Sequence, residues 1–266
     1  MISLDSIVSI KDALLDTLFP RSCVFCDSAR VEAKSFLCTD CIQTMREISH
    51  PFCSQCGLPI PGLALQSDGL CGRCLSAPPP YGRARYGVYY EGPLREALIR
   101  FKYYAALNLG NTLSDVLTAA FHRHYDSTEF DMIIPVPVHR KRLFQRGFNQ
   151  AVILATKLSA KAKVPVHRRS LIKVKDTLPQ ARLPKMQRLK NLRKSFGVLD
   201  PGNVREKRVL LVDDVATTGS TIAEATKTLL KAGASRVDAL VLALRTADFF
   251  NPDQIATNKQ GDGSWH

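Results

Sequence analysis

The sequence predicts an α/β protein in which a parallel sheet with flanking helices follows a small metal-binding module. Two observations lead to this fold class. Residues 208–244 contain an aliphatic strand, a polar turn, an amphipathic helix and a second aliphatic strand within about 35 residues, the pattern of a right-handed βαβ unit. All eight cysteines lie between Cys23 and Cys74, ahead of this unit.

Length and charge limit the possible functions. The chain has 266 residues, of which 45% are apolar and 23% charged, enough for one catalytic-sized domain and a smaller module. The net charge is +13, but residues 139–208 alone carry 20 Lys and Arg against three Asp and Glu. We therefore expect a polyanionic partner for this segment.

Residues 1–20 predict an amphipathic helix. Apolar residues recur from Ile2 to Leu18, interrupted by Asp5, Lys11 and Asp12, which a secretory signal would not show. No run of 18 apolar residues exists that could span a membrane. The polar face is acidic, so we expect the helix to pack on its own protein and the protein to be cytoplasmic.

The cysteines predict a zinc-binding module at residues 21–77. Every cysteine belongs to a Cys-x-x-Cys pair, and two such pairs can chelate one tetrahedral Zn²⁺, so four pairs predict two structural sites. A disulfide framework is disfavoured because the sequence shows no export signal. The candidate ligands are Cys23, Cys26, Cys38, Cys41, Cys53, Cys56, Cys71 and Cys74.

We expect consecutive pairs to share a metal, because the loops closed in this way are short. Cys23/Cys26 would then join Cys38/Cys41, and Cys53/Cys56 would join Cys71/Cys74, with interleaved pairing left open. A region of about 60 residues buries too little apolar surface to fold alone, so zinc should supply much of its stability.

Three consecutive prolines from Pro78 predict a stiff linker at 78–82 and a second domain at 83–247. Its first strand is predicted at 85–90, and a helix begins at Gly92-Pro93. A strand at 131–136 precedes a cluster of potential cations that suits an anionic group, although a surface charge run is the alternative. This cluster contains Val138, His139, Arg140, Lys141 and Arg142.

Further elements follow toward the C-terminus. A helix is predicted at 151–162, for which Asn149 could be the N-cap. Residues 171–196 carry eight basic residues and two prolines with little periodicity. A helix at 221–231 and a strand at 237–244 complete the βαβ unit. The tail at 248–266 is polar and is predicted to be flexible.

The turn of the βαβ unit carries the most specific pattern. Asp213 and Asp214 end the aliphatic strand, where carboxylates suit sugar hydroxyls or a hydrated divalent cation. A helix start rich in hydroxyls follows and suits a phosphate. An ordinary turn with Asp214 or Thr218 as N-cap is the alternative. The phosphate-binding candidates are Ala216, Thr217, Thr218, Gly219, Ser220 and Thr221.

The stretch VLLVDDVATTGST resembles the 5-phosphoribosyl 1-pyrophosphate (PRPP) motif of type I phosphoribosyltransferases, and residues 15–245 resemble the ComF/GntX family. This resemblance implies a double zinc ribbon, a type I phosphoribosyltransferase-like sheet, and PRPP bound with Mg²⁺. The cationic cluster at 138–142 would then wrap the pyrophosphate. A flexible loop within 171–196 would close over the site through Arg182, Lys185 and Arg188.

The residues and the family resemblance together imply two functions. The first is a phosphoribosyltransferase-like protein that transfers or senses a 5-phosphoribosyl group and that, as the resemblance to ComF-like proteins implies, is linked to DNA uptake and its machinery. The alternative is a non-catalytic competence factor that binds single-stranded DNA through residues 139–208. The aromatic residues that could stack on bases are sparse in this segment, with only Phe144, Phe148 and Phe196.

Overall fold

The structure is a computed structural model that divides into two compact units. The first unit joins Met1–Met45 to Glu91–Thr112, and the second joins Arg46–Tyr90 to Leu113–His266. Each unit contains one of the two cysteine groups. The described residues are 22–28, 31, 35–60, 69–104, 106–175 and 194–246.

The first unit is helical. A short helix, α2 (Thr39–Gln43), contacts the longer helix α4 (Gly92–Tyr103). Pro93 lies in the first turn of α4, where a proline fits because first-turn N–H groups have no partner within the helix. The buried residues of α4 recur every three or four positions, as one helix face requires: Pro93, Leu94, Ala97, Leu98 and Phe101.

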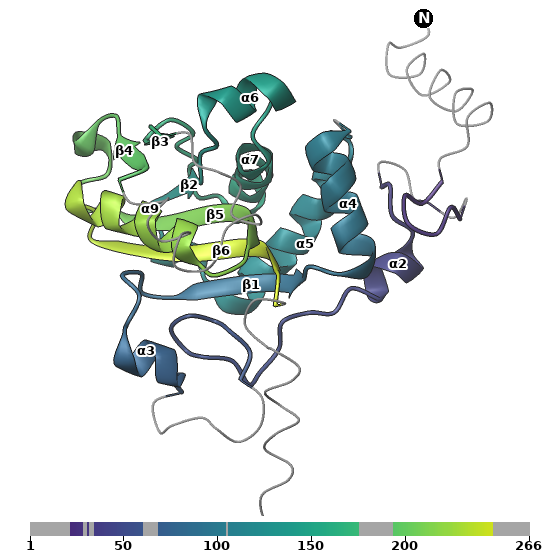
Figure 1. The fold of residues 1–266 in the computed structure, drawn as a ribbon, viewed down its shortest axis with the longest axis horizontal. Helices are drawn as coiled ribbons and strands as arrows, with labels where there is room; N and C mark the ends of the chain where they lie inside the picture. The colour runs from purple at the N-terminus through teal and green to yellow at the C-terminus, as the bar shows by residue number, and fades with distance from the viewer. Residues whose placement is uncertain are drawn as a thin grey trace, which may run out of the picture. The chain divides into compact units, whose positions relative to one another are not determined.

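The second unit is built on a four-stranded parallel sheet with the strand order β1-β6-β5-β2 (Figure 1). β5 and β6 are the longest strands and pair from Arg208 opposite Arg236 to Ala216 opposite Leu244. Residues 209–212 of β5 are fully buried, as expected for a parallel strand between two helical layers. The strands are β1 (Ala84–Tyr89), β2 (Met132–Pro135), β5 (Arg208–Ala216) and β6 (Arg236–Leu244).

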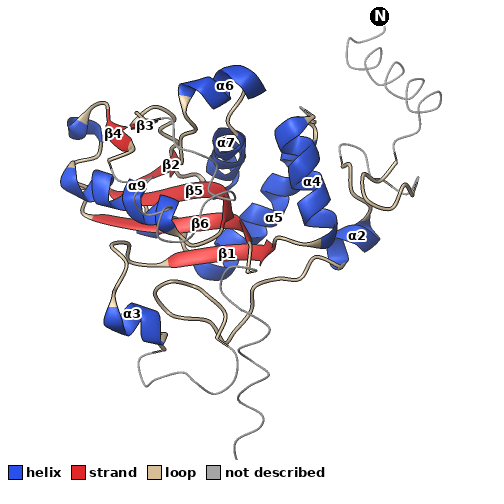
Figure 2. Ribbon diagram, viewed as in Figure 1, coloured by secondary structure: helices blue, strands red, loops and turns tan. Residues whose placement is uncertain are grey.

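Helices cover both faces of this sheet (Figure 2). After β2, helix α7 (Gln150–Ala162) packs on β2 and β5, and the chain then pairs Val166 with Ile133 on the outer side of β2. After β5, helix α9 (Ser220–Lys231) leads to β6, in the opposite direction along the sheet. Right-handed connections that run in opposite directions place their helices on opposite faces. The chain therefore diverges between β2 and β5.

Shorter elements complete the described fold. Helix α5 (Leu109–His124) begins in the first unit and continues in the second. The hairpin of β3 (Leu171–Lys173) and β4 (Phe196–Val198) is antiparallel, and β4 contacts α9. The others are α3 (Gly72–Ser76), α6 (Arg140–Arg146), and 3-10 turns at Ser127–Glu129 and Pro201–Asn203.

The outer edge of β1 is covered by the segment around the second cysteine group. Glu47 forms an antiparallel bridge with Val88, and the N–H of Ile48 donates to the carbonyl of Gly87 at 3.1 Å. Further along, the N–H of Ala84 donates to the carbonyl of Gln55 at 2.8 Å. These bonds satisfy backbone groups that an edge strand would otherwise leave exposed.

The fold class is confirmed. Helix α9 and strand β6 begin and end within one residue of the predicted positions, whereas β5 continues to Ala216, two residues beyond the predicted strand end at Asp214. None of the helices in the described ranges is long and apolar enough to cross a membrane. The predicted N-terminal helix at 1–20 and the predicted tail at 248–266 lie outside the described residues.

Gly87 lies in β1, where a Cβ would lie only 2.8 Å from the carbonyl oxygen of Leu242. Gly87→Ala should force β1 away from β6 and lower the free energy of unfolding by about 1–3 kcal/mol. The control Gly197→Ala places its Cβ 3.5 Å from the nearest atom and should change this free energy by less than about 0.5 kcal/mol. Chemical denaturation measures both; similar values would contradict the close approach of these strands.

His124 at the end of α5 is half-buried, with its ring edge-on to Phe52. Burial, reinforced by the charge of Arg85, lowers its pKa to about 4. Unfolded histidine has a pKa of about 6.5, so the unfolded chain takes up a proton first and stability is lost as pH falls from about 6.5 to 4. His124→Gln should flatten the melting temperature over this pH range, and His122→Gln, at an exposed position, should not. Equal slopes for wild type and His124→Gln would refute this assignment.

Candidate functional site

The two cysteine groups share one local turn. In each group, the residue after the second cysteine has a left-handed backbone, with φ of 57° at Asp27 and 68° at Gly57. Its N–H donates to the carbonyl of the first cysteine, Cys23 or Cys53, at 2.9 Å. The turn holds two thiols of a pair close together, as a chelating pair requires.

The second pair of each group lies at the start of a short helix, and backbone N–H groups point at the sulfurs. The N–H of Cys41 donates to Cys38 Sγ at 3.4 Å, and that of Cys71 donates to Cys53 Sγ at 3.3 Å. Burial opposes ionisation of the Cys53 thiol, but its backbone donors outweigh burial and lower its pKa to about 7. This thiol is thus prepared to bind metal as a thiolate.

The sulfur positions fit two zinc ions. Within each group, all four sulfur atoms lie within 4.8 Å of one another, and one pair in each group is 3.7 Å apart. Four sulfurs at zinc-bond length in a tetrahedron lie about 3.8 Å apart, whereas a disulfide needs about 2.05 Å. Consecutive pairing is confirmed and disulfides are absent from the described residues. The groups are Cys23, Cys26, Cys38, Cys41 and Cys53, Cys56, Cys71, Cys74.

The carboxyl ends of β2 and β5 form the point where the chain leaves toward opposite faces of the sheet. In open α/β sheets, ligands bind in the crevice at such a point, because the diverging loops leave room there. The predicted carboxylates lie in the last part of β5, the phosphate-binding residues begin at its last residue, Ala216, and the predicted cationic cluster follows β2. The topology therefore places these three predicted sets of residues at one edge of the sheet.

Asp213 and Asp214 lie near the carboxyl end of β5 and are half-buried. The N–H of Asp214 donates to Oδ1 of Asp213 at 2.8 Å. Successive side chains of a strand point to opposite faces, so Asp213 continues the row of Val209 and Leu211, which packs with α9. Asp214 belongs to the opposite row. A ligand that contacts both carboxylates must lie across the carboxyl edge of the sheet.

The loop after β5 leads to the N-terminus of helix α9. Gly219 is the N-cap of α9, with φ of 74°, and has no side chain to cap the helix. The alternative that Asp214 or Thr218 is the N-cap is therefore wrong. The hydroxyl of Thr218 shares a 2.7 Å hydrogen bond with that of Ser220 and also accepts from the N–H of Ser220 at 3.4 Å. Backbone N–H groups and hydroxyls gather at this positive helix end, which favours an anion.

Residues 136–139 leave the sheet beside the end of β5. The N–H of Val136 donates to the carbonyl of Val212 at 2.9 Å. Asn149 holds this segment from the other side, because its Nδ2 donates to the Val136 carbonyl at 3.0 Å while its Oδ1 accepts from the N–H of Ala151. The predicted N-cap role of Asn149 is confirmed, and the second bond ties the cap to the candidate site.

The predicted cationic loop is partly helical. Arg140 begins α6, and His139 is its N-cap, with Nδ1 accepting from the N–H of Lys141 at 3.3 Å. Gly147 ends the helix in a left-handed conformation with φ of 78°. The charges alone do not indicate a helix at this position. Gly147 does, because a glycine is a common signal for the end of a helix. In this cluster, Val138, His139 and Arg142 are half-buried and Arg140 and Lys141 are exposed.

The predicted flexible-loop residues Arg182, Lys185 and Arg188 lie outside the described residues. Tyr81, in contrast, was predicted only as part of the linker, yet its hydroxyl lies 3.6 Å from the position of a Cβ at Gly219. No sequence motif signals this contact, because Tyr81 and Gly219 are distant along the chain.

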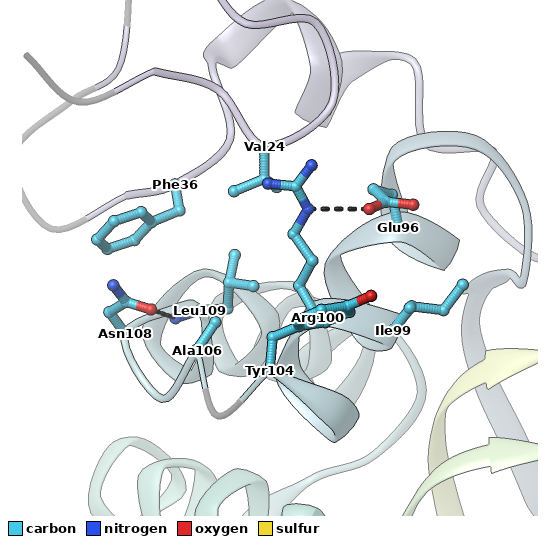
Figure 3. A pocket seen from close by; sticks show the side chains of 9 residues that line it. All are labelled: Val24, Phe36, Glu96, Ile99, Arg100, Tyr104, Ala106, Asn108 and Leu109. Carbon is cyan, nitrogen blue, oxygen red and sulfur yellow. Dashed lines mark hydrogen bonds and ion pairs between the residues drawn. The ribbon is translucent and has the colours of Figure 1, made fainter.

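A cavity of about 570 Å³ lies in the first unit and is lined by none of the predicted PRPP-binding residues (Figure 3). Arg100 points into it and pairs with Glu96 at 2.9 Å, so its charge is already balanced. A cavity with this lining does not suit a polyanion. The lining residues are Val24, Phe36, Glu96, Ile99, Arg100, Tyr104, Ala106, Asn108 and Leu109.

Elemental analysis of the purified chain should find two zinc ions, because each group offers four converging sulfurs. Cys56→Ser should leave one zinc, and Cys26→Ser should also leave one. Only Cys56→Ser removes a residue that packs in the core of the sheet, so it should lower the melting temperature of the second unit much more. Equal losses of stability in the two variants would contradict this difference in packing.

Comparison with known families supports the same organisation. The double zinc ribbon domain family matches residues 14–75, and the phosphoribosyl transferase domain family matches residues 110–262, more than half of the chain. Among solved structures, the chain is 16% identical to a glutamine PRPP amidotransferase from B. subtilis, with a TM-score of 0.38. This match covers 60% of this chain and 37% of that one, and it is too weak to add to the fold assignment.

Curated relatives share nearly the full length of the chain. "Competence protein F" of Haemophilus influenzae is 32% identical over 229 residues, which cover 85% of this chain and 97% of the relative. "DNA utilization protein YhgH" of Shigella flexneri is 32% identical over 221 residues, which cover 82% of this chain and 94% of the relative. With two four-cysteine groups and a phosphoribosyltransferase domain, the chain belongs to the ComF/GntX family.

Proposed function

We propose that this protein binds PRPP with Mg²⁺ at the carboxyl edge of its sheet and transfers or senses the 5-phosphoribosyl group. One arrangement supports the proposal above all others. The half-buried carboxylates of Asp213 and Asp214 precede the helix N-terminus at Gly219, and both lie where the chain diverges. Carboxylates accept hydrogen bonds from sugar hydroxyls, and a helix N-terminus favours a phosphate.

Each part of PRPP has a matching set of residues in this proposal. Asp213 and Asp214 would hold the ribose hydroxyls, and residues 216–221 the 5-phosphate. Residues 138–142, beside the end of β5, would hold the pyrophosphate. Arg182, Lys185 and Arg188 would add positive charge as the loop closes. The order of residues along the chain supports this assignment, because Asp213 and Asp214 come before the backbone N–H groups at the start of α9.

Transfer would break the bond between ribose C1 and the pyrophosphate oxygen, and an acceptor atom would bond to C1. The pyrophosphate leaves with the electron pair, so catalysis requires that its growing negative charge be neutralised. Arg140, Lys141 and Arg142 would supply positive charge there. Mg²⁺, when bound, would neutralise further charge on the leaving group. Closure of the loop would exclude water from the cation-like C1.

We also propose a role in DNA uptake or utilisation in the cytoplasm. The names of the curated relatives, a competence protein and a DNA utilization protein, support the first part. The cysteines support a cytoplasmic location, because all eight are free thiols in the described residues and gather as two metal sites. Such thiols stay reduced in a reducing compartment.

Asp214→Asn should weaken PRPP binding in the presence of Mg²⁺ by about 10- to 150-fold, the effect of losing a charged hydrogen-bond partner. Asp115→Asn is a matched control, because it also removes one carboxylate but lies at an exposed position of α5 and pairs with Lys161. Calorimetric titration measures binding, and melting curves should stay unchanged for Asp214→Asn. Unchanged PRPP affinity in Asp214→Asn would show that the carboxylates do not form the binding site.

A second candidate function is binding of single-stranded DNA by α6. Phe144 on this helix is 92% exposed, whereas Phe196 is buried in the core. Arg140 and Lys141 are exposed on the same helix. An exposed aromatic ring beside two cations can stack on a base while the cations contact phosphates. The two functions are compatible, with PRPP controlling a DNA-binding surface.

Phe144→Ala should weaken binding of a single-stranded oligonucleotide by about 5- to 150-fold, because one stacked base is lost. PRPP affinity should not change. Fluorescence anisotropy at several salt concentrations measures the DNA affinity, which should fall steeply with ionic strength. Leu143→Ala, at the neighbouring exposed position, controls for loss of apolar surface. Equal DNA affinity in wild type and Phe144→Ala would rule out stacking at this position.

A further inference from the structure

We propose that Tyr81 couples the second cysteine group to the loop at Gly219, so that metal bound by Cys53, Cys56, Cys71 and Cys74 raises the affinity of this loop for a phosphoryl ligand. The inference rests on the proposed function of the loop. It makes Tyr81 a positioning residue, which acts on the ligand through the backbone of Gly219.

Tyr81 supports the loop from within the core. Only 3% of Tyr81 is exposed, and it packs in the same core cluster as Ala216 and Ile222, which flank the loop. Its hydroxyl lies 3.6 Å from the position of a Cβ at Gly219. Gly219 has a left-handed backbone and starts α9, so packing of the Tyr81 ring beside this residue would help to set the direction of the helix N–H groups. Burial raises the pKa of Tyr81, which keeps its hydroxyl protonated.

The second cysteine turn holds the backbone on both sides of Tyr81. Gln55 lies between the two cysteines of this turn, and its Nε2 donates to the carbonyls of Pro79 and Tyr81 at 3.3 and 3.4 Å. The carbonyl of Gln55 accepts from the N–H of Ala84 at 2.8 Å. One residue of the metal-binding turn therefore holds the chain before, at and after Tyr81.

The cysteine turn also approaches β1 too closely to move independently. A Cβ at Gly57 would lie 2.2 Å from the carbonyl oxygen of Ala84. Arg85 adds a bond from its guanidinium to the carbonyl of Ser54 at 2.9 Å. Since metal coordination fixes the turn, it also fixes the segment that carries Tyr81. Without metal, Gln55 and Tyr81 lose this fixed support.

The first cysteine group provides an internal comparison. It belongs to the other compact unit, and within the described residues it shares none of the contacts of Gln55 and Tyr81. Phe25 occupies the position in the first turn that Gln55 occupies in the second, and it is 48% exposed. Coupling should therefore involve one of the two metal ions only.

Thermodynamic linkage makes this coupling measurable without any assay of catalysis. If metal at the second group strengthens binding of the phosphoryl ligand, the ligand must strengthen metal binding by the same factor. The full-length protein with two zinc ions would be titrated with a zinc-selective chelator, with and without PRPP and Mg²⁺. PRPP with Mg²⁺ should lower the equilibrium constant for transfer of one zinc ion to the chelator by about 2- to 30-fold. The constant for the other zinc ion should not change.

Variants identify the path. Gln55→Ala removes both side-chain bonds but no metal ligand, so it should abolish the protection of zinc and weaken PRPP binding. Phe25→Ala, the matched control, should do neither. Tyr81→Phe keeps the ring in the core and removes only the hydroxyl, so it should retain two zinc ions and bind PRPP more weakly.

The outcomes separate this inference from the proposed function. If PRPP binds the wild type but protects neither or both zinc ions, the coupling is wrong and PRPP binding stands. The same holds if Gln55→Ala and Tyr81→Phe bind PRPP as tightly as the wild type. If the wild type does not bind PRPP, both the proposed function and the coupling fail. Protection of one zinc ion, lost in Gln55→Ala but kept in Phe25→Ala, supports the coupling.

Discussion

The pairing of β5 with a parallel strand on each side is the constraint on which the rest of the structure depends. It buries residues 209–212 completely and leaves only the end of the strand open to ligands. Because the chain departs toward opposite faces after β2 and β5, polar residues can gather there without entering the core. Asp213 and Asp214 are half-buried for this reason, although they directly follow a fully buried run.

Much of this organisation could be predicted from the sequence, because a chelating cysteine pair and an aliphatic run each have one main structural explanation. The spacing of the cysteine pairs predicted which sulfurs converge, and aliphatic runs predicted the strands of the βαβ unit to within two residues. Helix α6 was not predicted, because its run of charged residues shows no helical periodicity. The signal for this helix is Gly147, the residue that ends it. The contact between Tyr81 and Gly219 could not be predicted, since it depends on how the core packs.

The two cysteine groups illustrate why composition does not define compact units. Both consist of Cys-x-x-Cys pairs and have the same turn, yet the second packs in the core of the sheet and the first does not. The difference arises from backbone bonds between Gln55 and Ala84 and between Ile48 and Gly87. Main-chain groups make these bonds, so no side-chain pattern reveals them. The proline run at 78–80 looks like a boundary but lies inside the second unit.

The covering of β1 has a consequence for solubility. Residues 84–89, Ala-Arg-Tyr-Gly-Val-Tyr, favour extended structure and carry one charge and no proline. Such a strand, once uncovered, offers its backbone to another polypeptide and can seed ordered aggregates. The thiol-rich turn that covers it offers four sulfurs to one metal ion, and loss of that metal would loosen the cover. Zinc starvation would thus turn a folded protein into a template for self-association.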